Sequence, residues 1–403
     1  MKKLYIIILI ALIASEAGLC PKHSHSQNVW TQKANFGGTA RQGAVGFSIG
    51  SKGYIGLGGD ASLTGYSDFW EWDQSANTWT QKASYPGTAL VYGIGFSIGI
   101  AGYVGTGYVN HNDFWKWDQG TNTWTQKANF AGVGRYNAVA FSIGNKGYVG
   151  TGSSGGPPYL NDFWEYDPAT DLWAQKANYP LHVSTRAAFS TGVKGYICNG
   201  WDYSTNLVSV YEYDPSMDTW TQKANYGGAK RSADEGFSFA GKGYVGTGRD
   251  GSIYYSDFWE FDPIANSWTQ RANFGGVARA FTVGFSIGSK GYYGTGLDAS
   301  GNVLQDFWEY SAINDAVNEI NLDNFISVFP NPTSGLFTLD AGRLTTGAMQ
   351  VEIYNTLGQK TYSAPAIGHP SSLIDLSNQP SGIYFLQIKT DQGMAVKKII
   401  LQR

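Results

Sequence analysis

A tryptophan followed by a short polar segment recurs six times in this chain at nearly constant spacing. The six residues are Trp30, Trp79, Trp124, Trp173, Trp220 and Trp268, so the successive periods are 49, 45, 49, 47 and 48 residues. A period of this length matches one four-stranded blade of a β-propeller. One such unit does not bury its apolar surface alone, so the copies are expected to pack on one another.

Each copy contains four short segments rich in β-branched and aromatic residues, separated by clusters of Gly, Asn, Asp or Pro. In the clearest copy, residues 141–144, 147–152 and 162–167 follow the segment headed by Trp124. Such segments predict antiparallel strands joined by turns. The polar residues after each Trp suit an outer edge strand, and the paired glycines suit strands that crowd together near the axis.

The order of the segments predicts how the ring closes. The first segment of the repeat region, residues 30–34, is of the fourth-strand type, whereas the last, residues 306–310, is of the third-strand type. The sixth blade therefore lacks an outer strand, and we expect residues 30–33 to supply it. The sequence thus predicts an all-β fold with a six-bladed propeller over residues 30–311.

These segments resemble the kelch-repeat (galactose-oxidase-like) propellers. The resemblance lies in the paired-Gly segment, the aromatic pair that follows it and the Trp after an Asp-rich turn, and it extends over residues 30–310. Two features depart from the kelch pattern. The usual Gly-Gly doublet is mostly Gly-Thr-Gly, as at residues 105–107, and the fourth copy reads Ser-Val-Tyr-Glu at residues 209–212 where others read Asp-Phe-Trp-Glu. The departures concern the subfamily and not the fold.

The N-terminus has the pattern of a secretory signal peptide. Two lysines precede an apolar stretch over residues 4–14, and small residues follow, so we place the cleavage after Ala17 and a linker over residues 18–29. The nearby Cys20 raises a lipoprotein alternative, which the bulky Leu19 before it disfavours. No other apolar run is long enough to span a bilayer, so no transmembrane segment is expected in the mature chain.

Composition excludes several classes of function. The net charge is −3, and Lys and Arg are not gathered in blocks, so nucleic acid is not an expected partner. Cys20 and Cys198 are the two cysteines of the sequence, so a disulfide framework is not expected, and Cys198 should be a small buried apolar residue. His111 and His182 lie on different loops, which is too sparse for a metal site. We therefore expect no cofactor, no metal, no catalytic residues and a monomer.

After Tyr310 the repeat stops. Residues 312–322 have the composition of a linker, and residues 323–403 contain short alternating strands that predict a small Ig-like β-sandwich. This segment resembles the C-terminal sorting domain of type IX secretion substrates. The matching motifs are Pro-Asn-Pro-Thr-Ser-Gly at residues 330–335, Gly-Gln at 358–359, Ser-Gly-Ile-Tyr at 381–384 and a basic-apolar end. The resemblance implies that the type IX machinery binds residues 323–403 and exports the chain across the outer membrane, so that the protein is released or attached to the cell surface. An accessory binding sandwich is the alternative.

Strand connectivity indicates which end of the propeller holds a binding site. Connections from the second to the third strand, and from the fourth strand to the next blade, emerge on one face, which we call the variable-loop face. From the last Gly of each second strand to the start of the third strand, the steps along the sequence are 10, 6, 10, 9, 9 and 10 residues. Because rigid scaffolds place recognition on variable loops, this face is the candidate site.

A partial ring of arginines lies on this face. Counting six residues back from each inner-strand Phe gives Arg41, Leu90, Arg135, Val183, Arg231 and Arg279. Kelch propellers that hold acidic peptides point arginines at this position into the channel mouth, so the resemblance implies an anion-binding mouth formed by the four arginines. The alternative is that each arginine pairs with an acid or a backbone carbonyl as part of the packing between blades.

The repeat is broken in the fourth and fifth copies. Three residues before the inner Phe, these copies carry Arg186 and Asp234 where others carry small residues, and Glu235 replaces an apolar residue. Because charges at apolar positions are costly unless paired, they predict either an Arg186–Asp234 salt bridge or a polar ligand pocket. Trp201 and Tyr203 in the fourth blade, with Tyr108 and His111 in the second, offer faces on which sugars stack.

Two classes of function follow. The favoured one is an exported, non-catalytic binding module for protein or glycan, because the scaffold is rich and no catalytic constellation is present. The alternative is a carbohydrate-active enzyme of sialidase or epimerase type, with acids and arginines of blades four and five on the variable-loop face.

Overall fold

The computed structural model describes residues 28–109, 111–312, 327–340, 349–356, 358–367, 371–390 and 393–403. The chain divides into two compact units, Met1–Ala312 and Ile313–Arg403. Every regular element among the described residues is a β-strand, as the sequence predicts. The expected signal peptide (residues 1–17), Cys20 and most of the two expected linkers lie outside the described residues.

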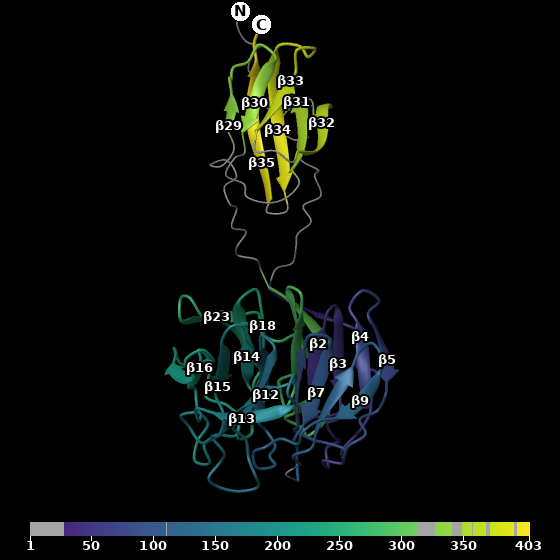
Figure 1. Cartoon of the computed structure of the whole chain (residues 1–403), viewed down its shortest axis with the longest axis vertical. Coiled ribbons are helices and arrows are strands. Elements are labelled where there is room, and N and C mark those ends of the chain that lie inside the picture. Colours follow the sequence, from purple (N-terminus) through teal and green to yellow (C-terminus); the bar gives the residue numbers. More distant parts are fainter. Residues whose placement is uncertain are drawn as a thin grey trace, which may run out of the picture. The chain divides into compact units, whose positions relative to one another are not determined.

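The first unit contains six four-stranded antiparallel sheets, whose innermost strands contact one another in a closed ring. Figure 1 labels strands from these sheets. Blade 1 consists of β2 (Val45–Ile49), β3 (Lys52–Gly56), β4 (Phe69–Asp73) and β5 (Thr78–Lys82). Blade 2 consists of β6 (Ile94–Ile98), β7 (Ala101–Gly105), β8 (Phe114–Asp118) and β9 (Thr123–Gln126). Blade 3 consists of β10 (Val139–Ile143), β11 (Lys146–Gly150), β12 (Phe163–Asp167) and β13 (Leu172–Lys176). Blades 4 and 5 are β14 (Ala188–Ser190), β15 (Gly195–Cys198), β16 (Val210–Asp214) and β17 (Thr219–Gln222); and β18 (Glu235–Phe239), β19 (Lys242–Gly246), β22 (Phe258–Asp262) and β23 (Ser267–Arg271).

The sixth blade confirms the predicted closure. It consists of β25 (Val283–Ile287), β26 (Lys290–Gly294), β28 (Phe307–Ser311) and, as its outer strand, β1 (Val29–Gln32). β1 runs antiparallel to β28, with Trp30 opposite Tyr310. Two short ribbons, β20 (Arg249–Asp250) with β21 (Ile253–Tyr254) and β24 (Arg279–Ala280) with β27 (Leu297–Asp298), extend the loops of blades 5 and 6.

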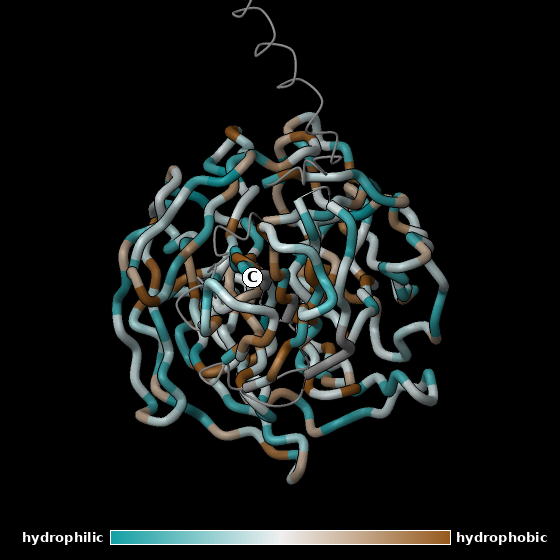
Figure 2. Tube along the Cα trace, turned by 90° about the horizontal axis from the view of Figure 1, so that it is seen from above, coloured by the Kyte–Doolittle hydropathy of each residue, from teal (hydrophilic) through white to brown (hydrophobic). Residues whose placement is uncertain are grey.

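The repeated Trp-Thr-Gln-Lys-Ala segment joins each blade to the next. The indole N–H of the Trp donates to the carbonyl of the Ala that ends the same segment in the preceding blade, over 2.8–3.2 Å. The pairs are Trp79–Ala34, Trp124–Ala83, Trp173–Ala128, Trp220–Ala177, Trp268–Ala224 and Trp30–Ala272. One segment thus serves as edge strand and as inter-blade contact. Seen from above, the outer rim of the trace carries mostly hydrophilic and neutral residues (Figure 2).

The inner strands pack through a Phe and a Gly from neighbouring blades. The inner Phe of each blade lies over the second-strand Gly of the next, where an added Cβ would stand 2.0–2.5 Å from the ring. The pairs are Phe47–Gly102, Phe96–Gly147, Phe141–Gly195, Phe189–Gly243, Phe237–Gly291 and Phe285–Gly53. Because a real Cβ cannot approach that closely, this close approach requires glycine.

The second unit is a β-sandwich, as predicted. One sheet contains β29 (Ser327–Phe329), β30 (Leu336–Asp340) and β33 (Ser371–Asp375), and the other contains β31 (Met349–Asn355), β32 (Lys360–Ile367), β34 (Gly382–Thr390) and β35 (Gly393–Leu401). Buried residues from both sheets, such as Phe337, Ile353 and Leu386, form one core.

Candidate functional site

The four arginines of the partial ring are buried within their own blades. The side chains of Arg41, Arg135, Arg231 and Arg279 are all 0% exposed. Each forms two hydrogen bonds of 2.6–2.8 Å with the Asp that opens the third strand of its blade, namely Asp68, Asp162, Asp257 and Asp306 respectively. Burial would raise the pKa of Asp68, but the hydrogen bonds and charge of Arg41 hold it below its usual value.

The remaining donors of these arginines are also used. In Arg41, Nε donates to the carbonyl of Thr39, Nη1 also donates to that of Leu57, and the guanidinium lies over the rings of Phe36 and Tyr66. The other three repeat this pattern of carbonyl contacts. A guanidinium that is buried and hydrogen-bonded in this way is not available to a ligand. The prediction that the four arginines form an anion-binding mouth is therefore wrong, and the alternative holds, since each arginine pairs with an acid and with backbone carbonyls.

Blades 2 and 4 replace this arrangement with others. Leu90 and Val183 stand in place of the arginines, and both are fully buried. In blade 2 the hydroxyl of Tyr85 donates to Asp113 over 3.0 Å, where the other blades use a guanidinium. Blade 4 lacks the carboxylate as well, since Ser209 replaces it. These two departures from the repeat are therefore changes in packing.

A second ring, made of backbone hydrogen bonds, runs around the channel mouth. It connects the residues four positions before each inner Phe, namely Gly43, Tyr92, Asn137, Thr185, Ala233 and Phe281. Amide-to-carbonyl bonds of 2.9–3.2 Å link Gly43 to Phe281, Tyr92 to Gly43, Asn137 to Tyr92, Thr185 to Asn137 and Phe281 to Ala233. We call this the mouth ring.

The mouth ring is open between blades 4 and 5. Among the described residues, the bond that would link Ala233 to Thr185 is not formed. Gly43, Tyr92, Asn137, Ala233 and Phe281 all have φ between +48° and +61°, whereas Thr185 does not belong to the residues of positive φ. Strand β14 is also shorter than its counterparts, with three residues instead of five. The fourth blade thus enters the ring by a different backbone path.

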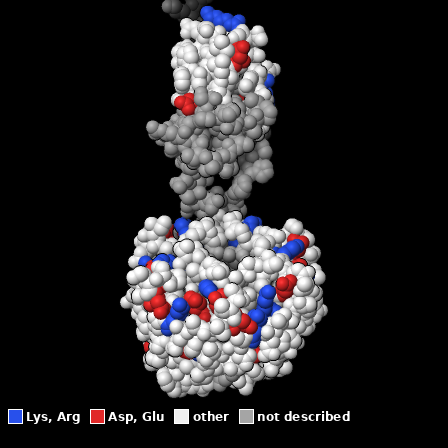
Figure 3. All heavy atoms as spheres, viewed as in Figure 1, with Lys and Arg blue, Asp and Glu red and all other residues white. Residues whose placement is uncertain are grey.

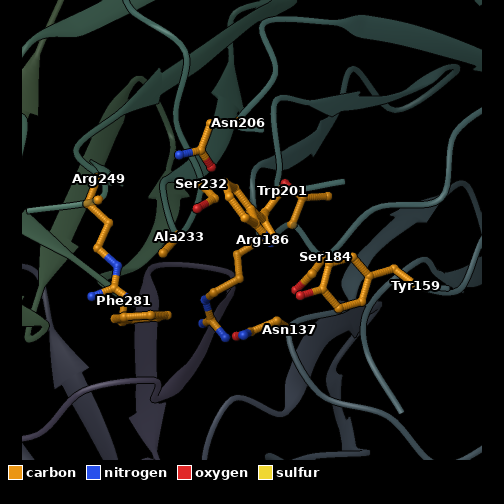
Figure 4. Close-up of a pocket in the computed structure, with 12 residues that line it drawn as sticks. Asn137, Tyr159, Ser184, Arg186, Trp201, Asn206, Ser232, Ala233, Arg249 and Phe281 are labelled. Atoms are coloured by element: carbon orange, nitrogen blue, oxygen red, sulfur yellow. The ribbon is translucent and has the colours of Figure 1, made fainter. Parts of the chain in front are cut away.

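A pocket of about 410 Å³ lies where the mouth ring is open (Figure 4). It is lined by Asn137, Tyr159, Ser184, Thr185, Arg186, Trp201, Asn206, Ser232, Ala233, Arg249, Gly251 and Phe281. All of these residues belong to connections from second to third strands or between successive blades, on the variable-loop face. Arg186 and Arg249 are its charged lining residues, and no carboxylate lines it among the residues that the structure describes.

Arg186 reaches from this pocket into the central channel. A smaller cavity of about 40 Å³ lies in the channel and is lined by Arg186, Glu235 and small or apolar residues of the inner strands. Nη2 of Arg186 donates to the carbonyl of Ala44 in blade 1, 3.1 Å away, and lies 3.7 Å from a carboxylate oxygen of Glu235. The Arg186 side chain therefore spans the channel between opposite blades.

Asp234 and Glu235 point in different directions, because consecutive residues of a strand alternate between its faces. Asp234 is 0% exposed and accepts a 2.6 Å hydrogen bond from Nδ2 of Asn199. The expected Arg186–Asp234 salt bridge is therefore wrong, and Glu235 is the partner of Arg186. Burial raises the pKa of Glu235 to about 8 and that of Asp234 to about 6, against the lowering effects of Arg186 and Asn199 respectively.

The two aromatic residues predicted for blade 4 differ in position. Trp201 lines the pocket, whereas Tyr203 is 55% exposed and packs edge-on against Tyr159, 5.7 Å between ring centres. The ten other lining residues, among them Arg249, were not predicted. A signal was available for four of them, because Asn137, Thr185, Ala233 and Phe281 occupy the mouth-ring position, where all six copies differ.

The described residues contain no group of three or more His, Cys, Asp or Glu side chains placed to hold a metal ion. Charges of both signs alternate across the propeller surface shown in Figure 3 instead of gathering by sign. Within the described part of the chain, no helix has the length and apolarity needed to cross a membrane.

Comparison with known proteins identifies the second unit. Residues 327–402 match the family described as "Secretion system C-terminal sorting domain". The C-terminal unit is a sorting domain. It directs type IX secretion, so the chain is exported across the outer membrane to the cell surface or the medium.

The propeller is similar to a solved structure. The structure of YjhT matches with a TM-score of 0.61 and 17% sequence identity, over 70% of this chain and 97% of that chain. At this identity the similarity shows the fold alone. No curated protein sequence matches this chain.

Proposed function

We propose that the propeller is a non-catalytic binding module of kelch type that takes one sugar residue of a glycan into the pocket at the open position of the mouth ring. The observation that carries this proposal is the pocket itself. Its volume of about 410 Å³ falls within the usual range for small-ligand sites, and Trp201 and Tyr159 supply aromatic surfaces. The sorting domain delivers this module to the cell exterior, where glycans are abundant.

The lining favours a sugar over a protein partner. Asn137, Asn206, Ser184 and Ser232 surround the aromatic side chains with amide and hydroxyl groups, which suit the many hydroxyls of a sugar. A protein partner needs a broad contact surface, whereas this site is a compact recess.

A glycan array tests this proposal. The secreted protein should retain a subset of glycans, and Trp201→Ala should abolish that retention. Tyr108→Ala is a matched control, because Tyr108 is a 41% exposed aromatic residue of the corresponding loop in blade 2 and lies outside the pocket. Equal loss of binding in both variants, or retention of acidic peptides without glycans, would contradict the proposal.

We also propose that residues 1–17 carry the chain to the periplasm before the sorting domain acts. A chain that ends at Ala312 should then accumulate in the periplasm as a folded propeller. Cell fractionation with detection of the propeller distinguishes the two locations. Finding the shortened chain in the medium would contradict the two-step route.

A second candidate function is a carbohydrate-active enzyme, and one observation favours it. Burial raises the pKa of Glu235 to about 8, so its carboxyl group is largely protonated at neutral pH, as a general acid requires. Glu235 lies in the channel below the pocket, where Arg186 separates it from the recess. Turnover of sialosides or galactosides by the protein, lost in Glu235→Gln, would establish the enzyme in place of the binding module.

A further inference from the structure

Arg186 is a buried arginine of the pocket, and two of its hydrogen-bond donor nitrogens are unused. Its side chain is 7% exposed, yet Nε and Nη1 are buried and have no hydrogen-bond partner within the described residues. Arg135, by contrast, donates two hydrogen bonds to Asp162 and one to each of two backbone carbonyls. Because leaving buried charged donors without acceptors is costly, this group is arranged to receive an acceptor from outside the chain.

The charge around Arg186 is not neutralised on the pocket side. Arg249 is the other charged lining residue there, with its guanidinium 5.1 Å from the centre of the Phe281 ring. The carboxylate within ion-pair distance of Arg186 is that of Glu235, on the channel side and 3.7 Å away, and its raised pKa limits the negative charge that it supplies at neutral pH. The pocket floor therefore favours an anion.

Two unused acceptors accompany the unused donors. The amide oxygens of Asn137 and Asn206 are buried and lack hydrogen-bond partners among the described residues. Figure 4 shows both amides at the same recess as Arg186, with Trp201 beside it. A simple inorganic anion would satisfy the guanidinium and leave both amide oxygens unpaired. A ligand that satisfies all of them carries a negatively charged acceptor together with hydroxyl donors.

We propose that the pocket binds a sugar residue that bears a carboxylate, with the carboxylate on Arg186 and the hydroxyls on Asn137 and Asn206. Carboxylate oxygens accept hydrogen bonds from a guanidinium with charge assistance, which makes these contacts the strong ones of the complex. The sugar ring lies against Trp201. This inference rests on the proposed glycan-binding function and names the class of sugar.

Matched pairs of sugars test the inference by isothermal titration of the full secreted protein. D-glucuronate and D-galacturonate carry the carboxylate, and D-glucose and D-galactose are their neutral counterparts. We expect at least one uronate to bind about 10- to 100-fold more tightly than its counterpart, as a charged hydrogen bond implies. Arg186→Gln should remove this preference, so that the uronate and its neutral counterpart bind the variant with similar affinities.

The double variant Arg186→Gln/Glu235→Gln guards against misfolding. Arg186→Gln alone leaves the Glu235 carboxyl without its partner, whereas the double variant removes both groups, and its thermal unfolding verifies the fold. It should show the same loss of preference. Equal binding of acid and neutral sugars by the wild-type protein would overturn the carboxylate subsite and leave glycan binding intact. An undiminished preference in the folded double variant, or tight binding of a glutamate-containing peptide with no binding of either uronate, would also overturn it.

Discussion

The indole nitrogen of Trp30 donates a hydrogen bond to the carbonyl oxygen of Ala272, 3.2 Å away and 242 residues distant in sequence. This bond is the last of six equivalent contacts between neighbouring blades. Trp30 also packs edge-on against Phe258 and Phe274, with ring centres 5.0 Å apart in both pairs. The N-terminal strand is thus joined to the fifth blade by the same type of contact that joins every other outer strand to the preceding blade.

Removal of the closing strand should destabilise the whole propeller. A chain that begins at Gly37 loses β1 and the Trp30 contacts, so we expect a large decrease in the melting temperature. The single change Trp30→Ala should cost about 3–5 kcal/mol of unfolding free energy, as for other buried aromatic side chains. Thr31→Ala, an exposed neighbour on the same strand, should change it by about 0.5 kcal/mol or less. An unchanged melting temperature in the shortened chain would refute the closure.

A tyrosine hydroxyl should be able to replace part of the arginine's contact with the Asp in blade 3, as it does in blade 2. Arg135→Leu removes the buried guanidinium and leaves the half-buried Asp162 carboxylate without its partner, which should cost about 3–5 kcal/mol. Adding Phe130→Tyr places a hydroxyl where Tyr85 has one, 3.0 Å from Asp113, and should restore about 1 kcal/mol. Urea unfolding of the single and double variants measures both steps. A double variant no more stable than Arg135→Leu would argue against the equivalence of the two arrangements.

Stability should fall as pH rises through the neutral range. Burial raises the pKa of Glu235 from 4.5 to about 8 and that of Asp234 from 3.8 to about 6. Between those limits the folded protein binds more protons than the unfolded chain, so the unfolding free energy decreases with increasing pH. Two ionisable groups other than Arg186 lie near the Glu235 carboxyl. The charge of Asp234 raises the pKa of Glu235, and the buried Tyr293 hydroxyl interacts electrostatically with it.

Glu235→Gln isolates this effect. Between pH 4.5 and pH 8.5, the unfolding free energy of the variant should decrease by about 1–3 kcal/mol less than that of the wild-type protein. Chemical unfolding at several pH values measures the two slopes. Identical slopes would show that Glu235 ionises in the folded protein as it does in the unfolded chain.

Cys198 should be inert until the propeller unfolds. It is fully buried, and burial raises the pKa of its thiol well above the usual value, so little thiolate is available. Iodoacetamide should leave the peptide containing Cys198 unmodified in the native protein and label it in concentrated urea. Mass spectrometry reads both states, and rapid labelling under native conditions would reveal local opening of blade 4.

The architecture could be predicted because each repeated residue meets the same partner in every blade. The Trp–Ala hydrogen bonds and the Phe–Gly contacts recur six times, so one interpretation of the motif applies to the whole ring. The closure followed from the order of the segments alone.

The sequence left two roles open for the arginines, although it contains a signal that decides between them. Each of the four is followed 26 or 27 residues later by the Asp that it binds, as Arg41 is by Asp68. In blade 4 both partners are absent together, which indicates a structural pair. The pocket itself was less accessible, because it depends on the backbone path at Thr185 and on the direction in which Arg186 turns. Side-chain type and spacing do not encode either property.

In the mouth ring, backbone hydrogen bonds hold the channel entrance in place, while the side chains determine what it can bind. Each of its residues is held by backbone atoms, so Gly43, Tyr92, Asn137, Ala233 and Phe281 share one conformation despite having unrelated side chains. Natural variation or laboratory selection at these positions would then alter what the entrance recognises while the blades remain assembled. A single propeller of this design offers six addressable positions for new ligand specificities.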